Sequence, residues 1–114
     1  MPTTTGFEFG DVVPFPFTDQ RTTKRQPAVV VSSGAYHRER PDLIILAVTS
    51  QVRAAPTVGE AALAKWKEAG LLKPSVLNPL IATIEKGFVL RKLGRLEQDD
   101  RRVLRDLLDD ILGR

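Results

Sequence analysis

The alternation of apolar and polar residues in the first half of the chain predicts three β-strands. Apolar residues recur at every second position over much of residues 7–17, which is typical of a half-buried strand. Pro14 and Pro16 lie within this stretch and leave two missing N–H donors on one side, so we expect an edge or bulged strand. Residues 28–33 and 43–48 are β-branched and aliphatic runs too short for typical helices, which favours strands buried on both faces.

Polar segments separate these strands, and helical periodicity appears in the second half. We expect a loop over residues 18–26 and a polar connection over 34–42. The second half is predicted to contain a short helix over 60–69, strands over 75–84 and 87–93, and a final helix over 98–112. Gly70 is the C-terminal stop of the short helix, and Asn78-Pro79 predicts a bulge. Runs of strands followed by a helix favour a mainly β, α+β fold, with residues 1–114 in a single domain.

Composition and charge narrow the classes of function. The chain has no cysteine, which excludes disulfides and thiolate metal sites, and its single histidine, His37, argues against a His-based metal site or dyad. The N-terminus lacks the pattern of a secretory signal, and no apolar run approaches the roughly 20 residues of a membrane span. We therefore expect a cytoplasmic protein with no membrane partner. The formal net charge of +3 suits a phosphate-bearing partner.

Six blocks of the sequence, in order and over nearly the whole chain, resemble the MazF/PemK-like type II toxins, or mRNA interferases. The blocks are GDVV at 10–13, PFTDQ at 16–20, PAVVVS at 27–32, VTSQ at 48–51, AGLLKPSV at 69–76 and LRKLGRL at 90–96. The last two resemble the PemK-like branch in particular. The resemblance implies an SH3-like small β-barrel of about five to seven antiparallel strands, with a C-terminal helix and one short internal helix.

The same resemblance implies a function and a set of partners. The chain would be the toxin of a type II toxin–antitoxin system, a homodimer and a sequence-specific endoribonuclease that needs neither metal nor cofactor. Its substrate would be single-stranded mRNA. A cognate antitoxin would neutralise it by placing an acidic, disordered tail in the basic groove and folding on binding.

Metal-independent RNA cleavage indicates which residues to look for. The substrate's own 2′-OH attacks the phosphate, so the protein must stabilise negative charge and help to move protons. In the family, the basic residue before the Pro-x-Val-Val strand and the threonine of the Thr-x-Gln block are the catalytic pair, which implies Arg25 and Thr49 here. The implied substrate-binding residues are Phe17, Thr18, Asp19, Gln20, Lys24, Gln26, Ser50, Gln51 and Asn78.

Two positions depart from the family pattern. The residue directly before the strand's proline is usually Arg, and this chain has Gln26 there, with Arg25 one position earlier. Related toxins often carry a charged residue near Leu80. Losing one preorganised transition-state contact commonly costs about 100- to 1000-fold in rate. The alternatives are therefore a catalytically weakened RNA-binding member and a CcdB-like module that binds DNA gyrase without cutting nucleic acid.

Three other features have both a structural and a chemical interpretation. His37 is a general base or a structural side chain, and its place outside the catalytic blocks favours the structural role. The aspartate pairs at 99–100 and 109–110 resemble metal-binding carboxylates, but they flank the apolar face of a helix, which favours solvated charges. Trp66 is interpreted as a core or dimer contact.

Overall fold

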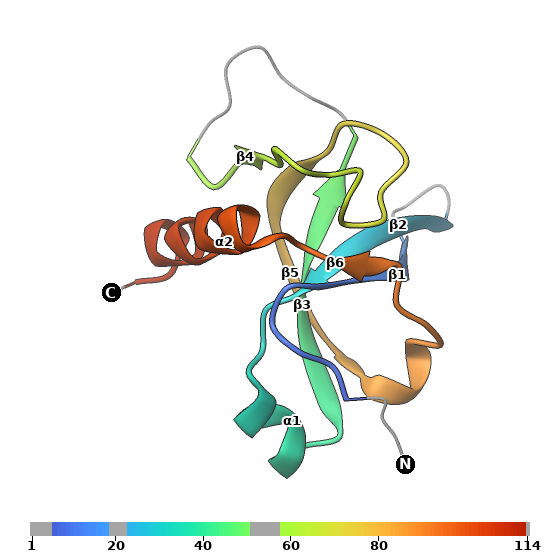
Figure 1. Ribbon diagram of the computed structural model, residues 1–114. Coiled ribbons are helices and arrows are strands. Elements are labelled where there is room, and N and C mark those ends of the chain that lie inside the picture. Colours follow the sequence, from blue (N-terminus) through green and yellow to red (C-terminus); the bar gives the residue numbers. More distant parts are fainter. Residues whose placement is uncertain (1–5, 19–22, 51–57, 114) are drawn as a thin grey trace.

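The computed structural model describes residues 6–18, 23–50 and 58–113, and for residues 16–18 and 23–25 it describes the backbone alone. These residues form a sheet of six antiparallel strands (Figure 1). The strands are β1 (Asp11–Thr18), β2 (Thr23–Val30), β3 (Asp42–Thr49), β4 (Ala61–Ala62), β5 (Val76–Glu85) and β6 (Gly94–Arg95). Their order in the sheet is β4-β5-β3-β2-β1-β6. The sheet curls into a half-barrel, which confirms the expected mainly β fold.

Within the described residues, three helical segments accompany the sheet. They are α1 (Gly34–Glu39), the 3₁₀ turn η1 (Lys86–Phe88) and the C-terminal α2 (Gln98–Ile111). The segment 58–75 crosses one end of the sheet, while α1 and η1 lie at the opposite end (Figure 1). No helix in the described ranges is long and apolar enough to cross a membrane.

The sheet buries side chains on both of its faces because successive residues of a strand point in opposite directions. The first core, under α2 and the segment 61–71, comprises Val12, Val29, Leu46, Val48, Leu63, Ala69, Leu71, Leu77, Leu96, Leu104 and Leu107. The second core, on the other face, comprises Val13, Ala28, Val30, Leu43, Ile45 and Val89. The central strands β2 and β3 contribute to both cores, which confirms the prediction of strands buried on both faces.

The prolines of β1 lie along a sheet edge, as predicted. β6 pairs only with Asp11 and Val12, so the rest of β1 has no strand on that side among the described residues. Pro14 and Pro16 fall in this outer part and face β2 on the other side. A proline without an N–H is tolerated there because the outer row of donors needs no partner strand.

The predicted bulge at Asn78-Pro79 is present in β5. Leu46 pairs with Ile81 and Val48 pairs with Leu77, so three residues of β5 lie opposite the single residue Ala47. A bulge at this point accommodates Pro79, which cannot donate to the ladder.

Two element boundaries differ from the sequence prediction. β2 begins at Thr23, so the predicted loop over 18–26 is too long. Residues 23–26 are polar and carry no apolar period that would indicate a strand, although they pair with residues 15–18 of β1. The predicted strand over 87–93 is wrong, because the chain turns through η1 to bury Val89 in the second core and reaches β6 only at Gly94.

The predicted helix over 60–69 is also wrong. Ala61–Ala62 form β4, and residues 64–70 form consecutive turns. The side chain of Asp100 accepts hydrogen bonds from the backbone N–H groups of Ala64 and Lys65, which fixes these turns on α2. Asp100 is therefore a buried anchor, and its interpretation as a solvated charge was wrong. The short internal helix is instead α1, capped by the Ser33 side chain.

Candidate active site

A pocket of about 870 Å³ lies where the ends of β2 and β3 meet two later segments of the chain. We call it the Thr49 pocket. Its walls come from β1 and β2 (Pro14, Gln26, Pro27), the end of β3 (Val48, Thr49, Ser50), the loop that follows the turns (Gly70, Leu71, Leu72, Lys73, Ser75) and the approach to β6 (Arg91, Leu93). This volume lies in the range of small-ligand sites.

The pairing of β2 with β3 brings Gln26 and Thr49 together. The β2–β3 ladder ends at the pair of Ala28 with Ala47, and Gln26 and Thr49 each lie two residues beyond this pair on their strands. Both side chains are half-buried and line the Thr49 pocket. A hydroxyl and a carboxamide that can both donate and accept hydrogen bonds therefore meet at one end of the sheet.

Close backbone packing holds the loop 70–75 against the segment that leads into β6. Gly70 has a φ of +91°, and a Cβ there would overlap the carbonyl of Leu93. The N–H of Leu93 donates a 2.7 Å hydrogen bond to the Val12 carbonyl, which ties the segment to β1. The loop is held at its other end because the N–H of Leu63 donates to the Ser75 carbonyl at 2.9 Å. These contacts fix the backbone on either side of the pocket.

The charges of the Thr49 pocket have one sign. Lys73 comes from the loop and Arg91 from the segment before β6, and no carboxylate lines the pocket among the residues that the structure describes. Two cations beside a hydroxyl and a carboxamide form a site that attracts an anion such as a phosphate. Arg91 and Lys73 lie in the LRKLGRL and AGLLKPSV blocks, and sequence reasoning did not select them.

Some of the predicted site residues line the Thr49 pocket, and others lie elsewhere or outside the described residues. Gln26, Thr49 and Ser50 line the Thr49 pocket, whereas Asn78 lies half-buried in the β5 bulge and is not part of the lining. The backbones of Phe17, Thr18, Lys24 and Arg25 belong to β1 and β2, and their side chains lie outside the described part of the chain. Asp19, Gln20 and Gln51 are themselves outside the described residues.

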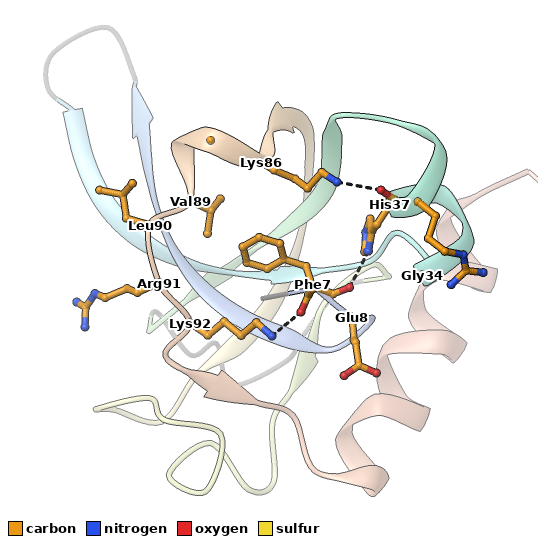
Figure 2. Close-up of a pocket in the computed structure, with 12 residues that line it drawn as sticks. Phe7, Glu8, Gly34, His37, Lys86, Val89, Leu90, Arg91 and Lys92 are labelled. Atoms are coloured by element: carbon orange, nitrogen blue, oxygen red, sulfur yellow. Dashed lines mark hydrogen bonds between the residues drawn. The ribbon is translucent and has the colours of Figure 1, made fainter. Parts of the chain in front are cut away.

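His37 has a structural role and does not line the Thr49 pocket. Its Nδ1 lies 2.8 Å from the Phe7 carbonyl, which can only accept, so Nδ1 carries the proton (Figure 2). Its Nε2 lies 2.6 Å from the Ser32 hydroxyl, whose oxygen also accepts from the Ile44 N–H. The buried imidazole therefore joins the N-terminal segment, α1 and β3. In the described ranges, no three His, Asp or Glu side chains gather as a metal site.

Comparison with known proteins identifies the family of this chain. The sequence model of the PemK-like, MazF-like toxin of type II toxin–antitoxin systems matches residues 8–112. The chain belongs to this family. No curated protein sequence gives a significant match. Because the match is to PemK-like and MazF-like toxins, the CcdB-like alternative is not favoured.

Solved structures share the fold of this PemK/MazF-family chain at low sequence identity. A MazE–MazF complex from Deinococcus radiodurans has a TM-score of 0.70 and 22% identity, with 92% of this chain and 95% of that chain covered. A mycobacterial endoribonuclease in complex with its cognate antitoxin has a TM-score of 0.67 and 18% identity, covering 92% and 91%. A MazF toxin from Mycobacterium tuberculosis has a TM-score of 0.68 and 18% identity, covering 86% and 91%.

Proposed function

We propose that this toxin is a metal-independent, sequence-specific endoribonuclease that cleaves single-stranded mRNA at the Thr49 pocket. The observation that carries the proposal is the meeting of Thr49 and Gln26 with two cations, Lys73 and Arg91, in a pocket without a described carboxylate. A polyanion enters such a site because the cations offset its charge.

The proposed reaction uses the nucleophile that RNA itself carries. The ribose 2′ oxygen bonds to the adjacent phosphorus as its proton leaves, and the bond from phosphorus to the 5′ oxygen breaks as that oxygen gains a proton. The products are a 2′,3′-cyclic phosphate and a 5′-hydroxyl. Negative charge grows on the phosphate oxygens in the transition state, so cations fixed around it lower the barrier.

Each described group has a role in this proposal. Lys73 and Arg91 contact the phosphate from two segments of the pocket wall, and the Thr49 hydroxyl hydrogen-bonds a phosphate oxygen. Gln26 and Ser50 contact the sugar or a base edge with hydrogen bonds. Arg25, proposed from the sequence, would add a guanidinium from β2 to the catalytic set.

The proposal extends to partners and compartment. Some solved relatives of this fold are complexes with an antitoxin, including the MazE–MazF complex and the mycobacterial endoribonuclease with its cognate antitoxin. We propose that this toxin likewise has a cognate antitoxin with an acidic tail, that it forms a homodimer and that it acts in the cytoplasm.

Incubation of the purified protein with total RNA in EDTA tests the nuclease directly. We expect fragments that end in 2′,3′-cyclic phosphates, formed without added metal. Thr49→Val keeps the shape of the side chain but removes the hydroxyl, and should lower the cleavage rate by about 100-fold. Thr83→Val, at an exposed position of β5, is the matched control and should cleave at the normal rate. Arg25→Ala should abolish most of the activity.

Three results would contradict the proposal. Intact RNA at stoichiometric excess of protein would exclude the nuclease, and cleavage only with added magnesium would exclude its metal independence. Equal rates for Thr49→Val and Thr83→Val would remove Thr49 from the reaction.

A further inference from the structure

A second pocket, of about 980 Å³, lies at the α1 end of the sheet and shares one residue with the Thr49 pocket. We call it the His37 pocket. Its walls come from the N-terminal segment, both ends of α1 and the stretch from η1 to Lys92 (Figure 2). Apart from Arg91, no residue that lines it has a role in the proposed cleavage reaction.

The His37 pocket concentrates positive charge. Arg38, Lys86, Arg91 and Lys92 line it together with a single acidic residue, Glu8. The formal excess of three positive charges equals the net charge of the whole chain. Such a local concentration attracts phosphates, because the remainder of the protein contributes no net charge to oppose it.

These cations differ in how far their charges are already compensated. The Nζ of Lys92 lies 3.2 Å from a carboxylate oxygen of Asp11. It also donates to the Gly6 carbonyl at 2.7 Å, and the Nζ of Lys86 donates to the His37 carbonyl at 2.9 Å (Figure 2). Within the described part of the chain, neither Arg38 nor Arg91 has an ion pair, and both are exposed. Their guanidinium groups are the ones available to an incoming anion.

The floor of the pocket is apolar and includes an aromatic ring. Phe7 is half-buried and Val89 is buried at its base, and Figure 2 shows the Phe7 ring between Val89 and Lys92. The Nζ of Lys92 lies 5.5 Å from the centre of that ring. An aromatic surface beside free cations is the combination that single-stranded nucleic acids use, with bases on the ring and phosphates on the cations.

Arg91 is the link between the two pockets. It lines both of them, and its guanidinium extends away from the Phe7 ring (Figure 2). An RNA strand with its reactive phosphate near Thr49 can therefore pass Arg91 and reach the second set of cations without leaving the protein surface.

We propose that the His37 pocket is a second RNA subsite, which holds a nucleotide flanking the cleaved bond, with Arg91 on the intervening backbone and Arg38 on a further phosphate. The proposal rests on the proposed function, because it takes the Thr49 pocket as the place of cleavage. An acidic peptide could satisfy the cations alone, but the shared Arg91 and the Phe7 ring favour RNA.

Binding of uncleavable RNA of two lengths tests this subsite. The probes are a 2′-O-methyl oligouridine trinucleotide, which fills one pocket, and a dodecanucleotide, which reaches both. Arg38→Gln should weaken binding of the dodecanucleotide by about 5-fold. It should also make the slope of log affinity against log salt concentration shallower by about 0.7. Its affinity for the trinucleotide should stay unchanged. Arg102→Gln, on an exposed face of α2 that lines neither pocket, is the matched control.

Two outcomes would overturn the subsite. One is an equal effect of Arg38→Gln and Arg102→Gln on the dodecanucleotide. The other is loss of binding to a polyglutamate peptide in Arg38→Gln with RNA binding intact, which would assign the pocket to an acidic protein. Because the probes cannot be cut, this comparison is separate from cleavage. Failure of the nuclease would instead show as intact RNA in the wild-type assay.

Discussion

The backbone N–H of Lys65 donates a 2.8 Å hydrogen bond to the carboxylate of Asp100, although 35 residues separate them in the sequence. The other carboxylate oxygen accepts from the Ala64 N–H at 3.0 Å. The Asp100 side chain is almost fully buried, so this pair of hydrogen bonds fixes the turns over 64–70 on the first turn of α2. The loop that carries Lys73 into the Thr49 pocket follows directly from those turns.

Replacing Asp100 with Asn should destabilise the protein. The amide can accept with only one atom, so one backbone donor is left unsatisfied in a buried place, which costs about 1–3 kcal/mol. Asp99→Asn is the matched control, because the Asp99 side chain is 68% exposed and its substitution should change the unfolding free energy by less than about 0.5 kcal/mol. Urea unfolding measures both variants. Equal midpoints would show that the anchor contributes nothing.

The backbone contact between Ala69 and Gly94 should tolerate no side chain. A Cβ on Gly94 would overlap the Ala69 carbonyl, and the backbone on both sides would have to shift. Gly94→Ala is therefore expected to lower the free energy of unfolding by about 1–3 kcal/mol and to weaken RNA cleavage, since the Thr49 pocket lies across this contact. The control is Gly87→Ala, where nothing lies within 4 Å of the added atom. Comparable unfolding midpoints for the two variants would contradict the close packing.

Gln26 offers a gain-of-function test. It lines the Thr49 pocket beside Thr49, where related toxins usually carry Arg, so Gln26→Arg should raise the cleavage rate by roughly 10-fold or more. Gln98→Arg adds the same charge at an exposed position at the start of α2 and should have no such effect. Single-turnover cleavage of a defined RNA measures both rates. A slower Gln26→Arg enzyme would indicate that Lys73 and Arg91 already occupy the phosphate position.

The ion pair of Arg40 with Asp42 predicts a pH dependence of known sign. The hydrogen bond that Arg40 donates at 3.2 Å lowers the pKa of Asp42 below its ordinary value of 3.8, with a further contribution from the Arg40 charge. Because the pKa is lowered, the pair stabilises the fold fully at pH values above the ordinary pKa of Asp42. This stabilisation is lost as the pH falls through the pKa of the folded state. Because the pair is exposed, the stabilisation is small.

The pKa itself is the better measurement for this pair. An NMR titration of the Asp42 carboxyl in Arg40→Gln should show its pKa rising towards the ordinary value. Arg38→Gln removes a neighbouring charge at the end of α1 and should leave the pKa of Asp42 unchanged. An unchanged pKa in Arg40→Gln would assign the lowering to another group.

Local patterns in the sequence were sufficient for the elements that bury a regular face. β3, β5 and α2 lie within one or two residues of their predicted bounds, because their apolar periods are enforced by the two cores. Residues 60–69 have an apolar spacing that fits a helix, yet they form turns. The deciding contact is Asp100, which no local pattern around residue 65 reveals.

Residues of the candidate site were predictable from the sequence only where they lie in or next to a block that the resemblance links to catalysis. Thr49 lies in the VTSQ block and Gln26 directly precedes the PAVVVS block, and the structure places both in one pocket. No local pattern shows that Lys73 and Arg91 line the same pocket, because their segments are brought together by glycines that allow two distant backbones to touch. A scan of the LLKPSV and LRKLGRL blocks for cations would have identified both as candidates.

The segment before β6 determines when the Thr49 pocket of this toxin can form during synthesis of the chain. Residues 91–93 close the Thr49 pocket, and Leu93 reaches back to hydrogen-bond Val12 near the other end of the chain. A nascent chain on the ribosome that has not yet exposed these residues cannot complete the pocket.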